Sequence, residues 1–164
     1  GRSGPFVAVT RGGELLPEVL EVLALVAEHD LVLATGHAPP GEALKIIEEA
    51  RRRGVDHVVV THAMTSPGGA MTLAQLREAA RLGAWLELIH SPLTDDKLRA
   101  AAEAIRTIGA GSFVLSSDLG QPNAPVHTDG LIALQRGLLA RGVTSDEIDA
   151  MARRNPARLL GLAP

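Results

Sequence analysis

A short apolar run followed by an amphipathic helical pattern recurs along the chain, and this repeat restricts the fold more than any other feature. Each run is almost continuously apolar and is bounded by Gly or Asp, which is typical of strands buried on both faces of a parallel sheet. Equivalent positions in successive runs, Thr35, Thr61 and Glu87, are 26 residues apart, a spacing that matches one β/α unit. Strands are therefore predicted at residues 31–35, 57–61, 85–89 and 113–116, with a weaker one at residues 6–10 that could join a hairpin around Gly12 and Gly13.

Residues that start and stop helices lie between the apolar runs. The first helix is predicted to begin near Pro17, and the second covers residues 41–53. No linker or low-complexity segment interrupts the pattern, so we expect a single domain over residues 1–164. Right-handed crossovers would place the helices either outside a closed barrel or on both faces of an open sheet, and the periodicity fits both. Further helices are expected after Thr72 with Gln75, after Thr94 or Asp95, over residues 129–141, after Thr144 with Glu147, and from Asn155-Pro156.

The composition excludes several classes of function. Aromatic residues make up 2% of the 164-residue chain and the formal net charge is -3, so we expect neither base stacking nor a basic surface, and no nucleic-acid partner. No apolar run approaches the ~20 residues that a membrane span needs, and no signal peptide is recognisable. We therefore expect a cytoplasmic protein without membrane contact. The chain has no cysteine, so a metal ion would be bound by histidine, carboxylate or water.

Three residues with metal-binding side chains, His37, His62 and Asp118, each come after one of the apolar runs. The carboxyl ends of parallel strands form the edge at which active sites lie, whether the sheet is open or closed. Taken singly, each residue could be a polar turn residue, but equivalent positions in separate β/α units favour a shared site. Two imidazoles and one carboxylate can bind Zn²⁺, Mn²⁺ or Fe²⁺ and leave positions open for water.

A second group of polar residues lies near the same predicted edge. Glu87 could point into a barrel and support a ligand, or it could be a buried acid paired with an arginine. We expect His127 to line the pocket and His90 to be a loop residue. His29 and His57 lie at the starts of predicted strands, at the edge associated with stability, and we do not include them in the site.

Four motifs together carry a resemblance to a known family. They are Thr35-Gly36-His37, Val60-Thr61-His62, Leu115-Ser116-Ser117-Asp118 and the closing segment 155–162, Asn-Pro-Ala-Arg-Leu-Leu-Gly-Leu. With these motifs the chain resembles the C-terminal half of an amidohydrolase-superfamily metal-dependent hydrolase, closer to the phosphotriesterase-like and uncharacterised branches than to ureases or dihydroorotases. The resemblance covers residues 15–162. It implies an α/β fold of the (β/α)₈ TIM-barrel type, of which this chain supplies about the last four β/α units and the C-terminal helices.

The resemblance also implies roles for the three residues. His37 and His62 would bind one metal ion, for which zinc is the first expectation and manganese or iron the alternatives. Asp118 would bind the other metal ion of the family's site and would take the proton from the bridging water as general base. The implied reaction is hydrolysis, in which metal-activated water attacks an amide, ester, lactone or phosphoester bond of a small-molecule substrate.

Part of the family's pattern has no counterpart in this sequence. Neither the His-x-His pair of the family's first strand nor the lysine or glutamate of its fourth strand is found before residue 31. We therefore expect a piece of a longer protein, a half-barrel completed by a missing N-terminal half or by a second copy in a homo-oligomer, or a chain that has lost the binuclear site. Three alternatives stay open: a decarboxylase or isomerase with the same ligands, a non-catalytic half-barrel assembly module, and an open doubly wound sheet that binds a small molecule.

Overall fold

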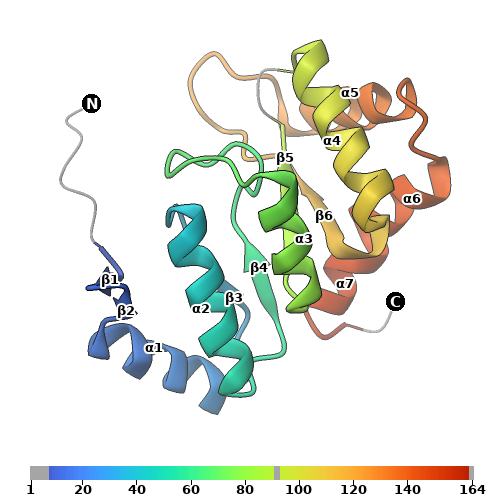
Figure 1. The fold of residues 1–164 in the computed structure, drawn as a ribbon. Helices are drawn as coiled ribbons and strands as arrows, with labels where there is room; N and C mark the ends of the chain where they lie inside the picture. The colour runs from blue at the N-terminus through green and yellow to red at the C-terminus, as the bar shows by residue number, and fades with distance from the viewer. Residues whose placement is uncertain (1–7, 91–92, 163–164) are drawn as a thin grey trace.

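A four-stranded parallel sheet forms the centre of the computed structural model, which describes residues 8–90 and 93–162 (Figure 1). The strands stand in chain order, in a register that pairs Leu33 with Val58 and Glu87 with Val114. All four predicted strands are confirmed, although the first two are shorter at both ends than their apolar runs. The strands are β3 (Leu33–Ala34), β4 (Val58–Val60), β5 (Trp85–Ile89) and β6 (Phe113–Ser116).

The three helices that connect these strands lie on the same side of the sheet in Figure 1. They are α2 (Pro40–Arg52), α3 (Leu73–Arg81) and α4 (Asp95–Ile108). A doubly wound sheet reverses its strand order, and no such reversal is present in the part of the chain that the structure describes. The open doubly wound alternative is therefore wrong. Strands in sequential order under one layer of helices form the arrangement of a parallel barrel segment.

Burial alternates along the middle strands. In β5, Leu86 and Leu88 are buried, whereas Glu87 and the two strand ends are half-buried on the opposite face. The expectation of burial on both faces is wrong for β4 and β5, because the connecting helices cover only one face. It holds for β6, whose first three residues are all buried, because the C-terminal helices also pack against this strand. Glu87 therefore lies on the face of β5 that the connecting helices leave uncovered.

The N-terminal part of the described chain is a small hairpin followed by a helix. Strands β1 (Thr10–Arg11) and β2 (Glu14–Leu15) pair in antiparallel fashion, and α1 (Pro17–Glu28) follows. Gly12 and Gly13 form the turn with φ angles of 60° and 88°, which glycine adopts without steric cost. The predicted hairpin is confirmed. The weaker strand at 6–10 falls partly outside the described residues, and its described end pairs within the hairpin instead of joining the parallel sheet.

Three helices follow β6, namely α5 (His127–Leu139), α6 (Ser145–Asp149) and α7 (Asn155–Leu159). Asn155 and Pro156 open the last helix, as predicted, and a π-helical segment, Ala150–Arg154, joins it directly to α6. Pro156 has no backbone N–H, so a segment with wider hydrogen-bond spacing fits before it. The capping boxes at α3 and α6 and the cap at Thr94 are confirmed.

In residues 8–90 and 93–162, no helix has the length and apolar character needed to cross a membrane.

Candidate functional site

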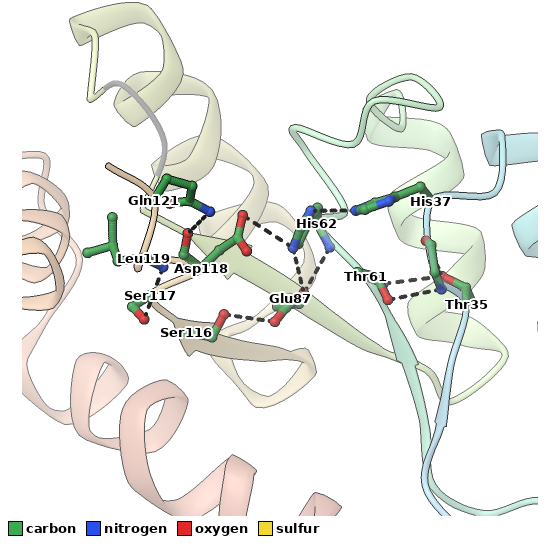
Figure 2. A network of polar contacts seen from close by, with 11 residues as sticks. Thr35, His37, Thr61, His62, Glu87, Ser116, Ser117, Asp118, Leu119 and Gln121 are labelled. Carbon is green, nitrogen blue, oxygen red and sulfur yellow. Dashed lines mark hydrogen bonds and ion pairs between the residues drawn. The ribbon is translucent and has the colours of Figure 1, made fainter. Parts of the chain in front are cut away.

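His37, His62 and Asp118 lie beyond the carboxyl ends of β3, β4 and β6, at one edge of the sheet (Figure 2). All three line a single cavity of ≈ 730 Å³. The remaining walls come from the loops that follow β4, β5 and β6 and from the first turn of α4. The fold therefore brings together three side chains that are up to 81 residues apart in the sequence.

The backbone turns sharply where each strand delivers its site residue. His62 has a φ of 50° and Asp118 a φ of 47°, and Gly36, directly before His37, has a φ of 61°. This left-handed conformation is uncommon for residues other than glycine, although His, Asp and Asn adopt it more readily than most. Gln121 supports the turn at Asp118, because its Nε2 donates a 3.1 Å hydrogen bond to the main-chain oxygen of Asp118. Non-glycine residues in this conformation often cluster at functional sites.

His62 is the central residue of the cluster. Its Nδ1 lies 3.3 Å from the Nε2 of His37, and the two rings are tilted by 47° with centroids 5.0 Å apart. Its Nε2 lies 3.6 Å from Oδ2 of Asp118. The His62 side chain is 14% exposed and that of Asp118 is 41% exposed. The imidazole of His62 thus links the histidine of one strand end to the aspartate of another.

Glu87 lies behind His62 on β5 and holds it through the main chain. Its Oε2 accepts a 2.9 Å hydrogen bond from the backbone N–H of His62, and its Oε1 accepts one of 2.7 Å from the hydroxyl of Ser116. The same Oε2 lies 3.9 Å from Nε2 of His62. Among the described residues Glu87 forms no ion pair with an arginine, so the structure places it beside the cluster, as a support for His62.

Two threonines that the sequence did not mark as site residues join the ends of β3 and β4. The backbone N–H of Thr61 donates to the hydroxyl of Thr35 at 3.2 Å, and the N–H of Gly36 donates to the hydroxyl of Thr61 at 3.1 Å. These reciprocal bonds fix the two strand ends that carry His37 and His62. Their equivalent positions in the 26-residue repeat are the sequence signal for this pairing.

Two other histidines differ in their position relative to the cavity. His90 lies in the loop after β5, as expected, and this loop also lines the cavity. His127 does not line it: its Nδ1 lies 2.8 Å from the hydroxyl of Ser117, at the start of α5. The expected pocket role of His127 is therefore replaced by a contact with the residue that precedes Asp118. The difference arises because residues 118–126 cross between the cavity and α5, a path that local sequence does not specify.

The donor types in the cluster suit a divalent cation, because imidazole and carboxylate are ordinary ligands of zinc. Within residues 8–90 and 93–162, however, no group of three or more His, Cys, Asp or Glu side chains surrounds a common point as ligands of one ion do. The reason is visible at His62, where His37 approaches Nδ1 and Asp118 approaches Nε2 on the other side of the ring. The three side chains are thus of the types that bind a divalent cation and lie close together, with His62 between the other two.

Comparison with known sequences identifies the family. Residues 2–87 match the model of a family of unknown function, DUF6282. The chain belongs to this family. No curated protein matches the DUF6282 chain. The family assignment therefore brings no activity with it.

Solved structures similar to the DUF6282 chain show what its fold is. An amidohydrolase from Pseudomonas aeruginosa matches 93% of this chain with 58% of its own length, at 15% identity and a TM-score of 0.72. A metallopeptidase from Rhodobacter sphaeroides, solved with a phosphinate mimic of the dipeptide L-Ala-D-Ala, matches 94% with 49% of its own length, at 20% identity and a TM-score of 0.69. The dipeptidase AC, a metallopeptidase of family M19, matches 94% with 50% of its length, at 20% identity and a TM-score of 0.68.

These likenesses confirm the predicted fold class. The chain has the α/β fold of the amidohydrolase barrel and spans about half the length of the solved structures it matches.

Proposed function

We propose that this chain carries part of the catalytic centre of a metal-dependent hydrolase, with His37, His62 and Asp118 as ligands in its divalent metal centre. Zinc is the first choice, because the ligand set is two imidazoles and a carboxylate, and manganese or iron are the alternatives. The observation that carries the proposal is the meeting of these side chains around His62, at the carboxyl edge of the sheet and in the wall of one cavity. The fold supports it, since it is shared with solved hydrolases, two of which are metallopeptidases.

The residues of the chain have separable tasks in this reaction. A divalent ion bound here would polarise a carbonyl or phosphoryl oxygen and make water a stronger nucleophile at neutral pH. Asp118, whose side chain is more exposed than that of His62, accepts the proton of the attacking water as general base. Glu87 keeps His62 in its left-handed conformation and so holds its ring between the other two residues. The bond broken is an amide, ester, lactone or phosphoester bond of a small molecule.

Metal binding tests the proposal directly. The chain is stripped with a chelator, and its affinity for Zn²⁺ is then measured by competition with a chromophoric chelator. We expect wild type to bind Zn²⁺, and His37→Ala, His62→Ala and Asp118→Ala each to weaken binding at least about tenfold. His29→Ala and His57→Ala are matched controls, because these histidines do not line the cavity. Failure of wild type to bind Zn²⁺, Mn²⁺ or Fe²⁺, or an equal loss in the controls, would reject the proposal.

We further propose that the described half-barrel associates through its sheet edges. Strands β3 and β6 each have one neighbour in the described sheet. Close to β3 in the sequence, the exposed apolar residues include Val22, Leu25 and Leu31, all more than half exposed. Open edges next to apolar surface favour pairing with further strands, either of a missing N-terminal barrel half or of a second copy. Sedimentation of the purified chain as a monomer at all concentrations would contradict association of this chain with itself.

A further inference from the structure

Lys97 stands out among the charged residues of the cavity. The chain has 16 Lys and Arg residues, and only two of them are lysines, Lys45 and Lys97. Lys97 lies in the first turn of α4 and lines the cavity that also holds His37, His62 and Asp118. Lys45 lies away from this cavity, in a groove that contains Glu48. Lys45 can therefore serve as an internal control for Lys97 in the same chain.

The position of Lys97 does not serve the stability of its helix. The helix dipole disfavours positive charge in a first turn and favours the acids Asp95 and Asp96 that precede Lys97 there. These two carboxylates pair with arginines, Asp95 with Arg99 and Arg141, and Asp96 with Arg99. Within residues 8–90 and 93–162, Lys97 takes part in no ion pair, and its ammonium group is available to a ligand.

A small apolar recess opens beside Lys97. It has a volume of ≈ 90 Å³, and its lining shares Thr65, Ile89 and Lys97 with the main cavity. Most of the other lining residues are apolar, including Leu88 and Ala101. A cavity of about 150 Å³ accepts benzene, so this recess suits a short branched alkyl group. Its one acidic lining residue, Glu87, already accepts hydrogen bonds on both carboxylate oxygens.

We propose that Lys97 binds the carboxylate of the substrate while the recess takes a short branched aliphatic group next to that carboxylate. This inference rests on the proposed hydrolase function and names the substrate class: a small aliphatic carboxylate whose scissile bond faces His62 and Asp118. A single ammonium group suits a monoanion. A phosphate dianion would need further donors, and the sequence holds no glycine-rich phosphate loop that could supply them.

The two lysines permit a direct test on the full chain without any metal. Reductive methylation with ¹³C-formaldehyde labels Lys45, Lys97 and the N-terminus and keeps their positive charge. Sodium isovalerate is the probe, and neutral isovaleramide is its matched control. With seven non-hydrogen atoms, isovalerate should bind with a Kd on the order of 10 mM. We expect a saturable shift of the Lys97 methyl signal and none at Lys45.

Substitution separates the charge from the recess. Lys97→Met keeps the aliphatic stem and should weaken isovalerate binding about tenfold, the loss of one charge-assisted hydrogen bond. This is followed in ¹⁵N-labelled protein at the amides of Thr65 and Ile89. Lys45→Met should bind isovalerate as wild type does. Isovaleramide should bind wild type and Lys97→Met equally weakly.

Four results would overturn the inference: equal binding of isovalerate and isovaleramide, equal loss in Lys45→Met, a shift that never saturates, or tighter binding of inorganic phosphate than of isovalerate. These outcomes are distinct from failure of the proposed function. If none of Zn²⁺, Mn²⁺ and Fe²⁺ binds but the Lys97 pattern is found, the carboxylate site stands and the hydrolase proposal falls. If Zn²⁺ binds through His37 and His62 but isovalerate binding does not depend on Lys97, the hydrolase proposal stands and this inference falls.

Discussion

The backbone N–H of His62 donates a 2.9 Å hydrogen bond to Oε2 of Glu87, across the boundary between β4 and β5. The left-handed φ of 50° at His62 is conformationally strained, and this hydrogen bond helps to offset the energy of that strain. The other oxygen of Glu87 holds Ser116, which ends β6. One carboxylate thus ties the middle of β5 to the ends of β4 and β6, and the position of the His62 ring depends on it.

Replacement of Glu87 should therefore weaken the fold as well as the site. Glu87→Ala leaves the His62 N–H and the Ser116 hydroxyl without their partner, and we expect a loss of about 1–2 kcal/mol of unfolding free energy, because the site is only partly buried. Glu87→Gln should lose less, since its amide can accept from His62 and donate to Ser116. Urea unfolding of the three proteins measures the difference. Equal losses in both variants would show that the two hydrogen bonds are not the cause.

Gly68 should be intolerant of any side chain. A Cβ at this position would overlap the carbonyl oxygen of His37 and crowd the backbone of Ala38. Gly68→Ala should therefore displace the turn that carries His37 and cost about 1–3 kcal/mol, the usual range for overpacking. Gly41→Ala is the control, because a Cβ there meets nothing within 4 Å and the residue is helical. Thermal unfolding and the His37 ring signals in NMR spectra would reveal the change, and a wild-type His37 spectrum in Gly68→Ala would contradict it.

Asn155 anchors the C-terminal helices to the start of β6. Its Nδ2 donates to the carbonyl oxygens of Ala110 and Phe113 at 2.8 and 2.7 Å, and the residue is 1% exposed. Asn155→Asp would place an acceptor against two buried carbonyls and should cost about 3 kcal/mol or more. Asn123→Asp, at an exposed position, should change stability by less than about 0.5 kcal/mol. Chemical denaturation compares the two, and a stable Asn155→Asp protein would show that the anchor is dispensable.

Local signals were sufficient to predict most of the described fold. The strands were predictable because their apolar runs are short and bounded, and the helix starts because residues such as Thr72 and Thr144 make their caps with neighbours three residues away. The role of Asn155 was not predictable, because its partners lie 45 and 42 residues earlier. The sequence marks Asn155 and Pro156 as a helix start, and α7 does begin there, but the π-helical segment that joins it to α6 carries no local sequence signal.

The site could be predicted only in part for the same physical reason. The repeat places His37, His62 and Asp118 at one edge, since this follows from strand direction. The central position of His62 depends on side-chain orientation, and the positions of His90 and His127 relative to the cavity depend on how two loops cross the edge. Lys97 belongs to no recognisable sequence motif. It reaches the cavity because α4 begins there, which is a property of the fold.

The ion pair between Asp95 and Arg141 should make stability depend on pH at the junction of α4 and the end of α5. The hydrogen bond from Arg141, assisted by the nearby charges of Arg99 and Arg141, holds the pKa of Asp95 below its usual range. A carboxylate whose pKa is lower in the folded state stabilises the fold above its unfolded pKa, and the contribution is lost as the pH falls through the folded pKa. Asp95→Asn should thus be less stable than wild type at pH 7, and the gap should close in acid, below about pH 4. Glu103→Gln is the control. Glu103 lies in the same helix and forms no ion pair with the described residues, so this variant should show no such gap. Urea midpoints measured from pH 7 downwards test this, and a gap that persists unchanged in acid would mean that Asp95 acts through packing and not through its charge.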